Sequence, residues 1–251
     1  MPAARRLSPD AEVDRDLNRS TDTAQEGDEA VSHNLNGQRL GRKGRDTRER
    51  ILAAAIELLE SSEDESISLS AVARKASLGM TSLYNYFTDL TELLLAVLEP
   101  VMATAEEAYV AMLRERWPDE EVGARCYQFL RGYYNFWLRH SRLLHLRNLM
   151  SDNRDERMLM HRVQSSQPMI ALLAAQMDNS GEETDTMAYA MATVLITGIE
   201  RTITVATDSR FTKVFGSGNR YQPEHYLKPE ARLMELAIRD TRDSMAGGGS
   251  G

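Results

Sequence analysis

The sequence predicts an all-α protein, and its composition, its apolar periodicity and its helix-boundary residues all support this class. Ala, Leu, Met, Glu and Arg are abundant, and each of them favours helix. Apolar residues recur at helical spacing along most of the chain after residue 45. Capping residues, glycines and prolines divide this pattern into separate segments. We therefore expect a small helical module followed by a larger helical domain.

The bulk composition limits the classes of protein that the chain can belong to. Its 251 residues, 42% of them hydrophobic, can bury more than one core. A single cysteine, Cys126, forms no disulfide within the chain and no multi-cysteine zinc site, and favours a reducing, cytoplasmic location. We expect Cys126 to be a small buried hydrophobe. Neither a membrane span nor a secretory signal is recognisable.

The net charge of −8 argues against a protein that coats nucleic acid indiscriminately, yet it permits a local basic surface. Residues 1–44 are polar, and we expect them to be disordered, as we do the glycine-rich tail at 246–251. The stretch 39–50 holds six basic residues against two acidic ones. Such a basic arm can follow a phosphate backbone or enter a minor groove, although a solvated linker has the same composition.

Helix boundaries after the basic arm indicate three short helices. Asp46 and Glu49 have the spacing of a capping box at the start of a first helix. Ser68 is the expected N-cap of a second helix, before the inward-facing Val72 and Ala73. A turn at 77–79 that contains Gly then precedes a third helix over 80–87. Two short helices joined by such a turn form the helix-turn-helix pattern.

A fourth helix follows the third. Asp89 and Glu92 form a second capping box. Pro100 lacks a backbone N–H, so we expect it to kink or split this helix.

The third helix has the residues that a recognition helix needs, small polar groups near its start and apolar groups behind. Leu83 and Phe87 can face inward, although the same spacing is common in plain cores. The hydroxyl and amide side chains suit base edges, and the tyrosines suit phosphates. The predicted DNA-contacting residues are Arg42, Lys43, Arg45, Arg48, Ser68, Met80, Thr81, Ser82, Tyr84, Asn85 and Tyr86.

Residues 45–93 resemble the N-terminal domain of the TetR family of bacterial repressors. The resemblance is carried by the strings RERILAAAIELL, SLSAVARKASLG and TSLYNYFTDLTELL. The family pattern Leu-Tyr-x-Tyr-Phe is matched at Leu83, Tyr84, Tyr86 and Phe87. This resemblance implies a DNA-binding domain over 45–92, a homodimer, a near-palindromic double-stranded operator and repression that responds to a small hydrophobic effector.

The chain departs from the family pattern at three places. Ser77 stands where the family often has Gly before the turn. Gly79 and Thr81 stand where the family often has Ser and then Gly at the third helix. Leu90 replaces a Lys that commonly contacts phosphate, and we expect the basic arm to compensate for this loss.

The domain over 93–245 is expected to be helical throughout. Pro168 should kink or split its helix, residues 209–228 should form a long loop, and Pro229 suits the first turn of the last helix. The expected helices span residues 101–115, 120–139, 141–151, 154–178, 183–208 and 229–244.

Two interpretations fit the aromatic segment from Cys126 to Met150. One is an amphipathic helix pair with a solvated basic face. The other, which the family resemblance implies, is a hydrophobic effector cavity. Its predicted lining is Tyr127, Phe129, Leu130, Tyr134, Trp137, Leu144, Met150 and Met169. Small residues in 183–208, with the last helix, resemble the dimer interface of the family.

Motifs of enzymes are missing from the sequence. It has no His-Glu-x-x-His, no paired Glu-x-x-His, no nucleophile elbow and no glycine-rich phosphate loop after a strand, so we expect no enzyme, cofactor or metal. We expect a cytoplasmic, nucleoid-associated regulator. The alternative is a DNA-binding protein without a small-molecule effector, controlled by protein partners. A filled core between residues 101 and 178 favours the alternative, and an open apolar cavity favours the sensor.

Overall fold

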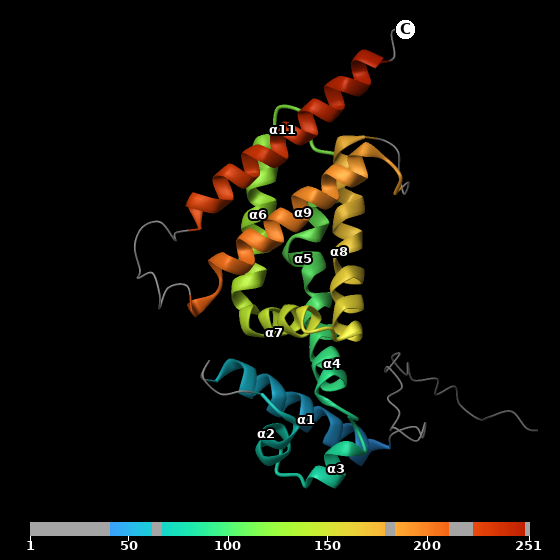
Figure 1. Ribbon diagram of the computed structural model, residues 1–251, viewed down its shortest axis with the longest axis vertical. Helices are drawn as coiled ribbons and strands as arrows, with labels where there is room; N and C mark the ends of the chain where they lie inside the picture. Colours follow the sequence, from blue (N-terminus) through green and yellow to red (C-terminus); the bar gives the residue numbers. More distant parts are fainter. Residues whose placement is uncertain (1–40, 62–66, 179–183, 211–222, 249–251) are drawn as a thin grey trace, which may run out of the picture.

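The computed structural model describes residues 41–61, 67–178, 184–210 and 223–248, and all regular elements within these ranges are helices (Figure 1). The all-α prediction is therefore confirmed. The predicted disorder of residues 1–40 lies outside the described residues. The helices are α1 Arg42–Glu60, α2 Leu69–Lys75, α3 Met80–Tyr84, α4 Leu90–Ala103, α5 Ala105–Ala108, the 3-10 turn η1 Val110–Leu113, α6 Val122–Arg139, α7 Ser141–Asp152, α8 Glu156–Met177, α9 Met187–Ala206 and α11 Glu224–Gly248.

Helices α1, α2 and α3 form a small module at one end of the molecule, and α4 leads from it into the larger body (Figure 1). The module is held by an apolar centre in which Ile51, Val72 and Leu83 are fully buried. The predicted cap of α2 is confirmed, because the Ser68 hydroxyl accepts the Ala71 N–H at 3.2 Å. This cap gives a partner to one of the free N–H groups at the start of α2, and so stabilises a helix of only two turns.

The predicted start of the first helix is wrong. α1 begins at Arg42, after Gly41, and Asp46 lies inside it and makes no cap. The Gly41 carbonyl already accepts the Arg45 N–H at 3.0 Å, so the first turn closes before Asp46. Water can satisfy the first N–H groups of an exposed helix. Residues 42–44, expected in the disordered extension, therefore belong to a helix.

Helix α4 joins the module to the body. The second capping box forms, with Asp89 Oδ1 accepting the Glu92 N–H at 2.9 Å and Glu92 Oε2 accepting the Thr88 N–H at 2.6 Å. Pro100 does not split α4, which continues to Ala103. The single helix expected over 101–115 is instead the end of α4, then α5 and η1. Trp117 closes this stretch, because its Nε1 donates to the Met112 carbonyl at 2.7 Å.

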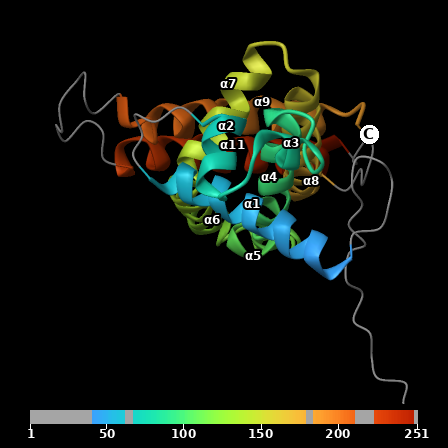
Figure 2. The ribbon, with the colours of Figure 1, turned by 90° about the horizontal axis from the view of Figure 1, so that it is seen from below.

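In the body, α6 and α8 run along the long axis of the molecule (Figure 1). Helix α11 packs obliquely on α6, α9 packs obliquely on α8, and α7 lies across the end of the body nearest α1 (Figures 1 and 2). Pro168 lies within an uninterrupted α8, so the expected split does not occur. The last helix is longer than predicted, because α11 starts at Glu224, inside the expected loop of 209–228, and continues to Gly248. Residues 211–222 of the expected loop lie outside the described residues. Pro229 therefore lies inside α11, where buried Leu227 and Ala231 hold the helix against the body.

Aromatic rings fill the centre of the body. Tyr109 lies edge-on to Tyr133 and Phe136, with ring centroids 4.8 and 5.3 Å away. Such edge contacts add to the stabilisation from burial. Cys126 is fully buried nearby, and burial raises the pKa of its thiol to about 12. The expectation of a small buried hydrophobe is confirmed for Cys126.

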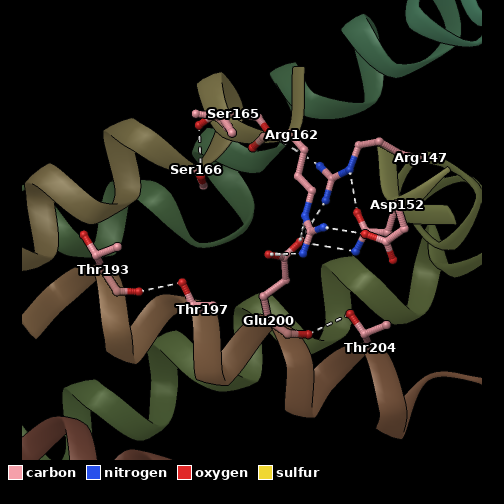
Figure 3. Close-up of polar contacts among 11 residues, drawn as sticks. Arg147, Asp152, Arg162, Ser165, Ser166, Thr193, Thr197, Glu200 and Thr204 are labelled. Carbon is pink, nitrogen blue, oxygen red and sulfur yellow. Dashed lines mark hydrogen bonds and ion pairs between the residues drawn. The ribbon is translucent and has the colours of Figure 1, made fainter. Parts of the chain in front are cut away.

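A buried polar network joins three helices of the body (Figure 3). Glu200 on α9 accepts from Arg147 on α7 at 3.1 Å and from Arg162 on α8 at 3.3 Å. The Arg147 side chain is only 5% exposed. Burial lowers the pKa of this guanidinium, and the Glu200 carboxylate opposes that shift. Each charge has partners, which is the condition for keeping ionised groups inside a core.

Candidate nucleic-acid interface

The turn between α2 and α3 has an unusual backbone at Ser77. This residue has a φ of 55°, in the left-handed region that favours glycine. The Leu78 N–H reaches back to the Ala73 carbonyl at 2.8 Å, which closes the end of α2. Ser77 therefore fits the turn at a conformational cost, at the position where the resembled family often has Gly.

Helix α3 presents a polar outer face and an apolar inner face. Leu83 and Phe87 are 0% and 1% exposed, and they anchor the segment on the module. Thr81, Ser82 and Asn85 are exposed on the other side. The inward placement of Leu83 and Phe87 is as predicted, although the helix ends at Tyr84 and the segment to Phe87 continues as a turn. The exposed groups have the donors and acceptors that base edges pair with.

The two tyrosines of this segment differ in exposure. Tyr84 is 47% exposed, whereas Tyr86 is half-buried and packs against the core. Tyr84 can therefore place its hydroxyl on a phosphate at little cost. Contact of Tyr86 with a phosphate stays a prediction.

Three predicted DNA-contacting residues have partners within the module. The Ser68 hydroxyl is engaged by the Ala71 N–H and lies 3.1 Å from the exposed Ser70 hydroxyl, which the sequence did not single out. Met80 is half-buried against the core. The Arg48 guanidinium lies 5.4 Å from the centre of the Phe87 ring. Ser68, Met80 and Arg48 thus support the module, whatever contact they make with DNA.

The contact between Arg48 and Phe87 places α1 beside the segment that follows α3. Figure 1 shows α1 and α3 in the same small module, at the end of the molecule farthest from α11. Arg42 and Lys43 are exposed in the first turn of α1, and Arg45 is half-buried. The predicted basic residues Arg42, Lys43, Arg45 and Arg48 therefore lie on a helix of the module, and are not part of a flexible arm.

Two contacts tie the start of α4 to the start of α8. The Thr91 hydroxyl donates to Asp155 Oδ2, although 64 residues separate them. Arg157 Nη2 donates to Asp89 Oδ2 at 2.8 Å. Burial raises the pKa of both aspartates, but the side-chain hydrogen bonds from Arg157 and Thr91, the backbone N–H donors and the charge of Arg157 together outweigh it, so both pKa values lie below the ordinary value.

A third contact ties the end of α1 to α7. Arg142 Nη1 donates to the carbonyl oxygens of Leu58 at 2.7 Å and Ser61 at 3.1 Å. The last carbonyls of a helix lack partners inside it, and cations are favourable there. Sequence analysis missed Arg142, Asp155 and Arg157, because their partners are far along the chain and no local pattern marks them.

The predicted effector-cavity residues do not surround one common cavity in the described part of the chain. Trp137, Leu144 and Met169 line a space of about 20 Å³, room for about one water molecule. Phe129 and Leu130 are fully buried, and Tyr134 and Met150 pack partly buried on the core. Tyr127 instead lines a separate surface recess of about 240 Å³ beside α11.

Comparisons with known proteins find similarity in structure alone. No protein family and no curated protein matches the sequence. The fatty acid degradation regulator FadR from Bacillus halodurans is similar over 80% of this chain and 99% of its own, with 11% identity and a TM-score of 0.53. A TetR family transcription regulator from Marinobacter aquaeolei VT8 matches over 78% of this chain and 98% of its own, with 18% identity and a TM-score of 0.44.

The similarity to FadR shows the fold. The chain thus shares the overall fold of that protein, and its α2 and α3 form a helix-turn-helix within it. No described helix is both long and apolar enough to cross a membrane. A search of the described residues for clusters of three or more His, Cys, Asp or Glu side chains that could hold a metal ion finds none.

Proposed function

We propose that this protein is a DNA-binding transcription regulator that reads DNA with α3. The main support is that α3 and the turn after it have a polar exposed face and an apolar buried face. Thr81, Ser82 and Asn85 are exposed. Leu83 and Phe87 are buried and anchor the segment on the module. A regulator fold and a basic first turn of α1 support the proposal. In this proposal α3 enters the major groove, and the basic residues of α1 contact phosphates.

Binding of the purified protein to its own upstream DNA, beside a random duplex across a salt series, tests this proposal. We expect tighter binding to the upstream DNA and a loss of affinity with rising salt on both duplexes. Weak binding that is equal on both duplexes, repeated with fragments selected from the whole genome, would reject sequence-specific recognition.

We further propose that the protein acts as a homodimer on a near-palindromic operator. The outer faces of α9 and α11 expose large apolar side chains, among them Val194 at 68% and Leu233 at 55%. Met187, Met191 and Leu236 extend the same exposed set. A two-fold contact through these helices would cover them and place two recognition helices about one DNA turn apart, or a multiple of it.

Light scattering after size-exclusion chromatography tests the dimer. We expect a dimer for the natural chain and a monomer for Val194→Glu and Leu233→Glu. Leu149→Glu is the matched control, because Leu149 is 56% exposed and lies on α7, which is not part of the proposed α9–α11 interface. A dimer that survives both α9 and α11 variants would exclude this interface.

Two modes of regulation remain in the proposal, and one observation separates them. Repression released by a small hydrophobic effector needs a cavity, whereas the space between Trp137, Leu144 and Met169 holds about one water. The closed core favours regulation by a protein partner over an effector inside the aromatic centre. A thermal-shift screen of apolar compounds distinguishes the two modes of regulation. An effector that binds in the aromatic centre must raise Tm and release DNA. Met169→Trp, which fills the space, must abolish both effects.

A further inference from the structure

A cleft lies between the α1–α3 module and the body, outside the aromatic centre. Its volume is about 390 Å³, within the range of small-molecule pockets. Its walls come from the end of α1, the middle of α4 and the junction of α6 with α7. The lining residues are Ile56, Leu59, Glu60, Ser61, Val97, Val101, Arg139, His140, Ser141, Arg142 and Leu143.

The lining is apolar on one side and cationic at the rim. Val97 and Leu143 are buried, and Val101 is half-buried beside them. Arg139 and Arg142 bring two guanidinium groups to the rim, against the single described carboxylate of Glu60. Burial and the neighbouring Arg139 lower the pKa of His140, which keeps this ring neutral at pH 7. Among its described lining residues, the cleft therefore combines an apolar wall with two guanidinium groups and one carboxylate.

We infer that this cleft binds a small monocarboxylate with an apolar body. The carboxylate pairs with Arg139, which is exposed at the rim, and the hydroxyl of Ser141 donates a further hydrogen bond to it. Guanidinium–carboxylate pairs are strong and directional. The apolar body covers Val97, Val101 and Leu143, and removing these side chains from water contributes the remaining affinity.

The occupant would touch the two parts of the protein that Arg142 holds together. Arg142 binds the carbonyls at the end of α1 from the first turn of α7, and both segments line the cleft. A ligand that binds more tightly to one arrangement of α1 against α7 changes the affinity for DNA by the same coupling factor. This coupling between ligand binding and DNA affinity rests on the proposed function, whereas the binding of the ligand itself does not.

Isothermal titration calorimetry of the full chain tests the binding, with octanoate, octanol and octylamine as probes of equal chain length and different charge. We expect saturable binding of octanoate and at least about tenfold weaker binding of octanol and octylamine. Arg139→Gln should weaken octanoate about tenfold and leave octanol unchanged. Arg125→Gln is the control, because Arg125 is exposed at the other end of α6. Val101→Trp should fill the cleft and abolish binding.

Several outcomes overturn the inference. Absence of saturable octanoate binding rejects the site, and so does octanoate binding that is indifferent to both Arg139→Gln and Val101→Trp. Octylamine as the preferred probe rejects the charge assignment, and would show that Glu60 or the acidic residues of 62–66, which lie outside the described residues, set the preference.

DNA binding with and without octanoate tests the coupling separately. A several-fold change in affinity that Arg139→Gln removes supports the coupling. An unchanged affinity in a protein that binds octanoate excludes it. If the protein binds octanoate but no specific DNA, the inferred carboxylate site is supported and the proposed function is rejected.

Discussion

Thr91 and Asp155 join the start of α4, next to the α1–α3 module, to the body through a hydrogen bond from a buried hydroxyl to a carboxylate. Thr91 is only 4% exposed, so little water competes for this contact. We expect Thr91→Val to lower the free energy of unfolding by about 2 kcal/mol, because the substitution keeps the shape and removes a hydrogen bond to a charged group. Urea denaturation measures this loss. Thr88→Val is the matched control, because its hydroxyl also donates to a carboxylate but is exposed. Equal losses for the two variants would contradict the special role of Thr91.

The same contacts predict how stability depends on pH. The folded pKa values of Asp89 and Asp155 lie below their ordinary value of 3.8. Groups of this kind contribute stability above their unfolded pKa and lose it as the pH falls through the folded pKa. We expect the urea midpoint to fall as the pH drops below about 4, and to fall less steeply in Thr91→Val. A slope that is the same in both proteins would assign the acid sensitivity to other carboxylates.

Ser77 predicts a stabilising substitution. Its φ of 55° costs a residue with a side chain about 1 kcal/mol, and glycine adopts it freely. We expect Ser77→Gly to raise the free energy of unfolding by about 1 kcal/mol without loss of DNA affinity. Ala76→Gly, at the neighbouring C-cap with a φ of −76°, should lower stability instead. A destabilised Ser77→Gly would show that the serine side chain has a role in the fold or in DNA binding.

Substitutions in α3 should separate base reading from phosphate contact. Asn85→Ala should narrow the difference in affinity between operator and random DNA, because base contacts carry specificity. Tyr84→Ala should weaken binding to both duplexes alike. Fluorescence anisotropy on the two duplexes measures both effects. An equal loss on both duplexes for Asn85→Ala would remove Asn85 from the base-reading group.

The arginines of α1 should divide into two groups. Arg42→Gln should reduce the salt slope of DNA binding by about one and leave stability unchanged, because Arg42 is exposed. Arg48→Gln should also cost about 0.5–1 kcal/mol of stability, because Arg48 lies over the Phe87 ring. Salt titrations and urea denaturation on the same proteins measure these effects. A stability loss in Arg42→Gln equal to that in Arg48→Gln would remove the distinction.

The buried network around Glu200 predicts the largest loss of stability. Glu200→Leu leaves Arg147 buried without its carboxylate, which should cost about 3–5 kcal/mol. Adding Arg147→Met should recover much of this loss, since the second charge then also disappears. Glu235→Leu is the control, because Glu235 also pairs with two arginines, but these arginines are 61% and 37% exposed. A double variant as unstable as Glu200→Leu alone would show that Glu200 acts through other contacts.

Local patterns predicted the fold class and the inner and outer faces of α3, because helix periodicity and caps depend on neighbours within one or two turns. The boundaries of α1 and α11 were predicted less well. The capping-box spacing at Asp46 and the position of Pro229 each predicted a helix start that is too late in the chain, because a closed first turn at Gly41 extends α1 and buried Leu227 extends α11.

Contacts that position the DNA-binding module could not be predicted from local patterns. Arg142 meets its carbonyl partners across 84 residues, and Arg157 meets Asp89 across 68. The aromatic segment gave an amphipathic pattern that is the same for a filled core and for a lined cavity. Only the side-chain packing around Trp137 separates these alternatives.

Pro100 makes α4 easier to bend at one turn. Its missing N–H leaves one turn of the helix without its usual hydrogen bond, between the part held by the module at Leu93 and Leu94 and the end at Ala103. Bending at this turn costs less than bending elsewhere in α4. A small rotation at Pro100 displaces α3 by an amount that grows with the distance between them. In the proposed two-fold assembly, such a rotation would change the spacing between the two α3 helices while the cores of the module and the body stay rigid.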